Sequence, residues 1–142
     1  MKNQTETLLA SAWTVALTAV LGSLYFSEVQ RYVPCELCWV QRIFMYPLVI
    51  TLAVAVIRKE AAHAYYALPL AIIGGGFSLY HYLLQKVPAL QEAGEVCGVV
   101  PCNAQYINAA GFITIPFLAL TAFTIISILL VLVIRGEKRR NE

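Results

Sequence analysis

Hydrophobic residues occur along the chain in four long runs that short polar segments separate. The runs cover residues 8–26, 39–57, 64–84 and 112–134. An uncharged run of about 19 residues crosses a hydrocarbon core of roughly 30 Å as a helix that rises about 1.5 Å per residue. Arg42 is the only permanently charged residue inside any run. The pattern predicts an all-α integral membrane protein, a bundle of four transmembrane helices that forms one membrane domain over residues 1–142.

The composition agrees with a membrane protein. Hydrophobic residues make up 60% of the chain and charged residues 13%, whereas soluble domains carry about 25% charged residues. A net charge of +2 is too small to indicate binding to nucleic acid. The first run exceeds the roughly 7 to 15 apolar residues of a signal peptide, so we expect it to be a retained span.

Basic residues predict the orientation of the bundle. If the N-terminus is cytoplasmic, the inner segments hold seven basic residues: Lys2, Arg58, Lys59, Arg135, Lys138, Arg139 and Arg140. The outer side then holds three: Arg31, Arg42 and Lys86. Inner loops of membrane proteins are enriched in Lys and Arg, so we expect both termini inside a plasma membrane, with residues 136–142 as a basic tail against anionic lipid.

All four cysteines then lie on the extracytoplasmic side. Cys35 and Cys38 belong to the first outer segment, residues 27–38, and Cys97 and Cys102 to the second, residues 85–111. Disulfides persist in such a compartment. Pairing within each segment is favoured by reach, yet bridges over such short loops stabilise a fold by only about 2 kcal/mol. Weakly favoured, accessible disulfides suit thiol exchange.

The stretch from Pro34 to Arg42 carries the strongest chemical signal. Cys35 and Cys38 are separated by two residues at the expected start of a helix, where unpaired backbone N–H groups and the macrodipole favour a thiolate. Arg42 follows Cys38 by four residues and shares its helix face. Arg42 as an interfacial anchor, and His81 as a member of an aromatic belt, remain the structural alternatives.

Proline and glycine punctuate the second outer segment. We expect one interfacial helical turn over residues 89–93 and a tight turn over residues 97–102. Two structural disulfides, or a closed zinc site built from all four cysteines, are the competing interpretations of the cysteine pattern.

The arrangement Pro34-Cys35-x-x-Cys38-x-x-x-Arg42, with four spans and a second cysteine pair before the last span, resembles the DsbB family of membrane thiol:quinone oxidoreductases. The resemblance covers essentially the whole chain and is closest to the short Gram-positive branch, BdbC. Residues 80–85, Tyr-His-Tyr-Leu-Leu-Gln, are similar to the family segment that holds a quinone-adjacent histidine. Longer members separate their second pair widely, whereas four residues separate Cys97 from Cys102 here.

The resemblance implies an electron relay in disulfide-bond formation. An extracytoplasmic thioredoxin-fold oxidase would pass electrons to Cys97 and Cys102, this pair would reduce Cys35 and Cys38, and a membrane quinone of the menaquinone or ubiquinone type would accept them. Arg42, His81 and Cys38 would bind the quinone. Arg42 would stabilise the Cys38 thiolate and the developing quinone anion, and His81 would donate a hydrogen bond or carry a proton. No metal is expected.

Two other functions remain open. Enzymes similar to vitamin K epoxide reductase are also four-span, quinone-linked proteins, but they place the C-x-x-C pair in the last helix, where this chain has none. A non-enzymatic membrane scaffold with loop disulfides is the second. For the relay, we expect the quinone at the outer end of the bundle, between residues 39–57 and the region of His81.

Overall fold

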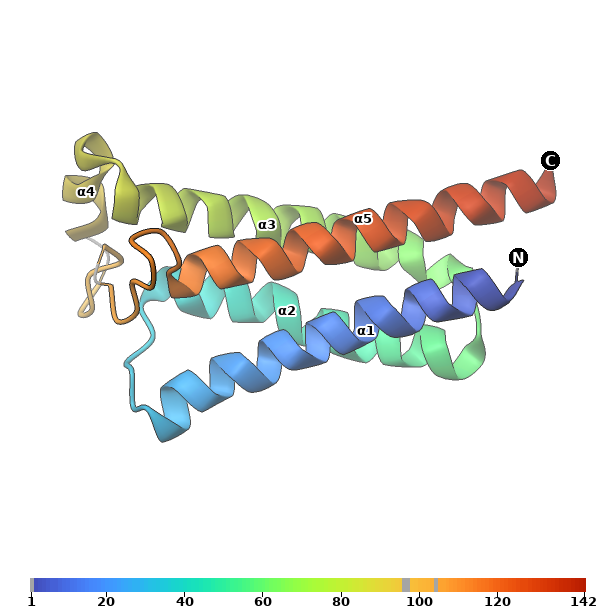
Figure 1. Cartoon of the computed structure of the whole chain (residues 1–142), viewed down its shortest axis with the longest axis horizontal. Helices are drawn as coiled ribbons and strands as arrows, with labels where there is room; N and C mark the ends of the chain where they lie inside the picture. The colour runs from blue at the N-terminus through green and yellow to red at the C-terminus, as the bar shows by residue number, and fades with distance from the viewer. Residues whose placement is uncertain (1, 96–97, 104) are drawn as a thin grey trace.

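The computed structural model describes residues 2–95, 98–103 and 105–142. Four long helices run side by side along the long axis of the molecule (Figure 1). They are α1 (Lys2–Leu24), α2 (Glu36–Arg58), α3 (Ala64–Lys86) and α5 (Ile115–Asn141). All four are long and apolar enough to cross a membrane. The predicted four-helix membrane bundle is therefore confirmed.

Several helix ends differ from the limits of the hydrophobic runs. The first helix continues beyond α1 as a π-helix, Tyr25–Val29. Helix α2 begins at Glu36, because Cys35 is extended and serves as the N-cap residue. Helix α5 begins only at Ile115, since residues 109–114 form a turn closed by backbone bonds between Ala109 and Ile113.

The basic segment after residue 134 is helical and not an irregular tail. Helix α5 continues to Asn141, with Lys138, Arg139 and Arg140 in its last turn. Cations at this end interact favourably with the negative pole of the helix macrodipole. The C-terminal residues therefore extend the fourth helix by about two turns beyond the apolar run.

The two outer segments meet at one end of the bundle. Helix α4 (Pro88–Glu95) and the turns that follow it lie beside the start of α2, at the end opposite both termini (Figure 1). This helix confirms the expected helical turn in the second segment and is longer than predicted. Tyr106 of the second segment stacks on Tyr32 of the first, with ring centroids 4.8 Å apart. Its hydroxyl donates to the carbonyl of Val33 at 3.2 Å.

Small residues allow close packing between the helices. Helix α3 packs on α2 and α5, and α1 packs on the same two helices. Where α3 meets α5, the Phe123 ring lies directly over Gly74, and a Cβ atom at Gly74 would collide with it. Gly76, two residues on, has no atom within 4 Å of the corresponding position. Packing therefore requires glycine at position 74 but not at position 76.

We expect Gly74→Ala to lower the stability of the protein by about 1–3 kcal/mol, because the added methyl group forces the Phe123 ring out of place. Gly76→Ala is the matched control and should be neutral or slightly stabilising, since alanine favours a helix more than glycine does. Thermal unfolding of the purified variants in the same detergent measures both effects. Equal midpoints for the two variants would contradict the packing described at Gly74.

Candidate thiol redox site

The first turn of α2 holds two sulfurs in contact. Cys35, the N-cap residue, is buried, and Cys38 is half-buried. Their Sγ atoms lie 3.2 Å apart, with the Cys35 thiol donating to the Cys38 sulfur. The Trp39 N–H bonds the carbonyl of Cys35 at 3.2 Å and closes the turn. The C-x-x-C sequence thus places both sulfurs at the helix start, as predicted.

In the reduced pair, one cysteine donates a hydrogen bond and the other accepts it. The hydrogen bond to Cys38, together with burial, raises the pKa of Cys35 to about 12, although the nearby His81 acts in the opposite direction. A thiol with so high a pKa keeps its proton at neutral pH. Cys35 is therefore the proton donor of the pair, and Cys38 is the acceptor.

His81 connects α3 to both outer segments. Its side chain is 2% exposed. Nδ1 lies 2.8 Å from the Gln41 amide nitrogen, and Nε2 lies 3.0 Å from the carbonyl oxygen of Cys102 and 3.6 Å from Cys35 Sγ. Because an amide nitrogen only donates, Nδ1 accepts from Gln41 and the ring proton belongs on Nε2, which donates to the Cys102 carbonyl.

Sequence reasoning missed Gln41. This residue is 6% exposed and fixes the orientation of the His81 ring by its hydrogen bond to Nδ1. The signal that identifies it is an uncharged polar side chain inside an apolar run, one turn after the C-x-x-C pair. Polar groups within membrane helices face the bundle interior and partner other polar groups.

Cys102 lies next to the first cysteine pair. It is fully buried in a small cluster with Cys35 and Leu84, and Cys38 packs against that cluster. The structure therefore brings together three of the four predicted catalytic cysteines, with His81 between two helices and the loop. Cys97 lies outside the described residues. Its neighbour Gly98 adopts a φ of 61° and lies against the Glu36 side chain.

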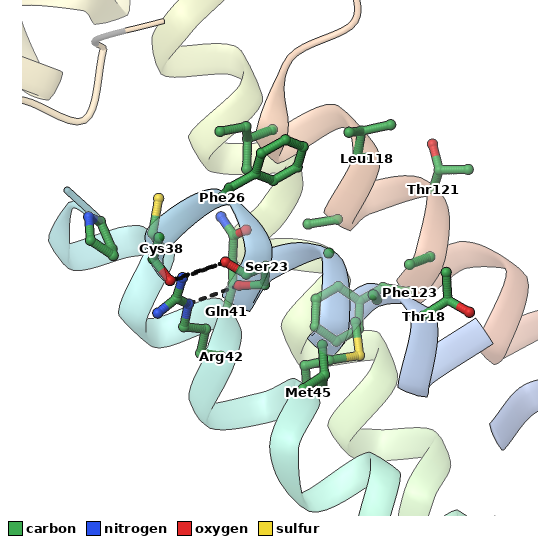
Figure 2. A pocket seen from close by; sticks show the side chains of 18 of the residues that line it. Thr18, Ser23, Phe26, Cys38, Gln41, Arg42, Met45, Leu118, Thr121 and Phe123 are labelled. Carbon is green, nitrogen blue, oxygen red and sulfur yellow. Dashed lines mark hydrogen bonds between the residues drawn. The ribbon is translucent and has the colours of Figure 1, made fainter. Parts of the chain in front are cut away.

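Arg42 points into the bundle. It is 8% exposed, and its guanidinium points to Ser23 (Figure 2). Nε donates to Ser23 Oγ at 2.8 Å, and Nη2 donates to Ser23 O and Ser27 Oγ, both at 2.9 Å. The guanidinium carbon lies 5.1 Å from the centre of the Trp39 ring. No carboxylate pairs with Arg42 among the described residues. The cation is therefore held by neutral oxygens at the end of α1.

A cavity of about 500 Å³ opens between α1, α2 and α5 beside these residues. Cys38, Gln41 and Arg42 line one end, and apolar side chains such as Met45, Leu118 and Phe123 line the rest (Figure 2). Its volume falls within the range of roughly 300–1,000 Å³ that is typical of small-molecule sites.

The position of this cavity differs from the predicted quinone site. We expected the site between α2 and the His81 region of α3, but Phe44 and Phe77 stack there with centroids 5.6 Å apart, and Gln41 bonds His81. Neither His81 nor Cys35 lines the large cavity. Both line a second cavity of only about 20 Å³, and Cys38 lines both cavities.

The fold and the candidate site together define a four-helix membrane protein with cysteines gathered at one end of the bundle. The sequence profile of the family described as "Disulfide bond formation protein DsbB" matches residues 5–134. The chain belongs to this DsbB family of membrane disulfide oxidoreductases. It therefore acts in disulfide-bond formation.

Individual relatives agree with the family assignment. "Disulfide bond formation protein C" of Bacillus subtilis (strain 168) is 54% identical over 138 residues, which are 97% of this chain and 99% of that protein. "Probable disulfide formation protein C" of Halalkalibacterium halodurans is 53% identical over 137 residues, 96% of this chain and 100% of that protein. "Probable disulfide formation protein" of Oceanobacillus iheyensis is 49% identical over 141 residues, which are 99% of this chain and 97% of that protein. No solved structure matches the chain significantly.

The raised pKa of Cys35 predicts the pH dependence of its alkylation. Because only the thiolate reacts, the rate at Cys35 in the reduced protein should increase about tenfold per pH unit up to pH ~10 without levelling off. Mass spectrometry after brief treatment with iodoacetamide measures this rate separately for each cysteine. If the alkylation rate at Cys35 levelled off near pH ~8.5, the ordinary pKa of a thiol, the hydrogen bond from Cys35 to Cys38 would be contradicted.

Proposed function

We propose that the chain oxidises a dithiol protein outside the membrane and passes the electrons through its two cysteine pairs to a membrane quinone. The observation that carries this proposal is the position of the first pair. Cys35 packs against Cys102, whereas Cys38 lines the large apolar cavity beside a buried cation. The first turn of α2 thus places Cys35 against the second outer segment and Cys38 at the cavity in which a lipid-soluble cofactor would bind.

The relay begins at the second cysteine pair. A thiolate of an extracytoplasmic thioredoxin-fold oxidase attacks Cys97 of the Cys97–Cys102 disulfide, and Cys102 leaves as a thiolate. The partner's second thiol then attacks the mixed disulfide, which releases the oxidised partner and the Cys97 thiolate. Exchange of this kind needs an accessible sulfur and a good leaving thiolate. The assignment of Cys97 as the attacked sulfur rests on the family resemblance.

The electrons then move to the first pair. The Cys102 thiolate attacks Cys35 of a Cys35–Cys38 disulfide, so a Cys35–Cys102 bond forms and Cys38 leaves as a thiolate. Cys97 next attacks Cys102, which restores the Cys97–Cys102 disulfide and leaves Cys35 and Cys38 reduced. The burial of Cys102 in one cluster with Cys35 supports this order of attack. Cys35 takes up a proton from the aqueous side, and His81, whose Nε2 lies 3.6 Å from Cys35 Sγ, relays it.

The residues around the large cavity fit a quinone of the menaquinone or ubiquinone type. The cavity is mostly apolar and ends at Cys38 and Arg42. The chemistry that a quinone would supply there is the acceptance of two electrons and two protons from the reduced pair. Arg42 holds a positive charge beside Cys38 without a carboxylate partner among the described residues, and therefore stabilises negative charge on the sulfur and on a ligand next to it. His81 acts on Cys35 in this scheme, because it does not line this cavity.

We place the redox end of the bundle outside the cell. Seven basic residues against three favour this orientation. Single cysteines in a cysteine-free variant test it. An impermeant maleimide on intact cells should label Glu92→Cys in α4, and should label Glu142→Cys only after the membrane is opened. Labelling of Glu142→Cys in intact cells, with Glu92→Cys protected, would reverse the orientation.

Cys102→Ser should trap the partner on Cys97. In this variant the Cys97 thiolate attacks the disulfide of the oxidised partner and forms a mixed disulfide. Without Cys102 this chain offers no nearby second thiol to exchange with it, so the adduct accumulates. Non-reducing electrophoresis followed by mass spectrometry identifies the joined cysteines. Cys97→Ser is the matched variant and should form no adduct. Accumulation with Cys97→Ser instead would assign the attack to Cys102.

Arg42→Ala should reduce the kcat of quinone-dependent oxidation by about 10²–10³-fold, the effect of losing one group that stabilises developing charge. The kcat of Arg42→Lys should lie between those of the wild type and Arg42→Ala. Lysine keeps the charge but not the planar fork that meets Ser23 and Ser27. Arg31→Ala, which removes an exposed cation from the same end, is the matched control. Unchanged kinetics for a folded Arg42→Ala protein would leave Arg42 as an anchor only.

A further inference from the structure

Three potential metal ligands converge at the start of α2. The sulfurs of Cys35 and Cys38 and a ring nitrogen of His81 all lie within 4.8 Å of one another. We propose that the reduced form binds one zinc ion through these three side chains. This site differs from a four-cysteine site, because its donors come from the start of α2 and from α3 and not from the second outer segment.

The distances suit tetrahedral zinc. Zn–S bonds of about 2.3 Å and Zn–N bonds of about 2.0–2.1 Å separate two sulfurs by about 3.7 Å, and a sulfur from a nitrogen by about 3.6 Å. Cys35 Sγ lies 3.6 Å from His81 Nε2. The two sulfurs lie 3.2 Å apart and need to separate by about 0.5 Å to bind the ion. Cys38 Sγ also lies within 4.8 Å of the His81 ring nitrogen, so the half-buried Cys38 side chain is the ligand that has to move.

The charge balance favours the ion over other cations. Binding follows Zn²⁺ + 2 R–SH → Zn(SR)₂ + 2 H⁺, so two thiolates neutralise the metal charge. A neutral complex avoids the large cost of burying a net charge. Thiolate and imidazole donors select zinc over magnesium or calcium, which prefer oxygen. Because two protons are released, affinity increases with pH.

The surroundings offer a fourth ligand and a second shell. The cavity of about 20 Å³ is lined by the three donors and by Thr114, and it has room for about one water molecule. The Thr114 hydroxyl is buried and has no hydrogen-bond partner among the described residues. A water on the metal satisfies this hydroxyl. Metal binding through Nε2 moves the ring proton to Nδ1, where a turned Gln41 amide accepts it through its oxygen.

The consequence for activity rests on the proposed function. A metal-bound pair lacks the free thiolate that exchange and quinone reduction require, so zinc would stop the enzyme after electrons reach Cys35 and Cys38. A disulfide at this position has no thiolate to offer, so the oxidised enzyme would not bind the ion. Zinc inhibition would therefore depend on the redox state of the pair.

Binding is tested without partner or quinone, on the full-length protein in detergent. Co²⁺ serves as a spectroscopic probe, and Zn²⁺ competes with it. We expect one Co²⁺ per reduced chain, with a thiolate-to-cobalt charge-transfer band that Zn²⁺ removes, and no band for the oxidised chain. The double variant Cys97→Ser/Cys102→Ser should keep the band. His81→Ala should weaken binding at least about tenfold, whereas His63→Ala, at the other end of the bundle, should not.

A second measurement needs no variant. Zn²⁺ should slow iodoacetamide alkylation of Cys35 and Cys38 in the reduced wild-type protein about tenfold or more, because zinc holds both thiolates. Absence of both the band and the protection would overturn the proposal. So would a band that His81→Ala leaves unchanged in affinity, or one that the double cysteine variant abolishes. Quinone reduction measured with a chelator present reports on the relay separately, so failure of one proposal is distinguishable from failure of the other.

Discussion

A buried guanidinium has to keep its hydrogen bonds, and this requirement determines how the cysteine-bearing end of the bundle is built. A charged side chain inside a membrane run costs several kcal/mol unless other groups solvate it. Ser23 and Ser27 solvate Arg42 from the end of α1 and the π-helix that follows it. Local π-helical geometry is frequent at functional sites. The result is a fixed cation beside Cys38, at the end of an apolar cavity.

The second constraint is the hydrogen-bond chain through His81. Gln41 orients the ring, and the ring in turn holds the backbone of Cys102. Because Gln41 and Arg42 are adjacent on α2, one helical turn supports both the loop side and the cavity side of the cysteine pair. This accounts for two sulfurs 3.2 Å apart having different neighbours. In the proposed relay, the two sulfurs of this pair therefore connect the loop to the cavity.

Much of this arrangement is predictable from the sequence. Uncharged runs of membrane length predict the four helices, and the spacing of Cys35, Cys38 and Arg42 predicts which side chains meet at the start of α2. The sequence does not show which helix faces which, because apolar residues surround every helix. It does not show where a cavity lies either, because the stacking of Phe44 on Phe77 between α2 and α3 depends on tertiary packing. The π-helix and the role of Gln41 depend on it as well.

The central claim is that electrons leave through Cys38 into the cavity between α1, α2 and α5. Filling that cavity tests it most directly. Gly22 lines the cavity and Gly76 does not, and a Cβ at either position meets no atom within 4 Å. Gly22→Phe should raise the apparent KM for quinone and leave disulfide exchange between Cys102 and the first pair unchanged, whereas Gly76→Phe should alter neither. Quinone kinetics that respond to Gly76→Phe but not to Gly22→Phe would contradict the account.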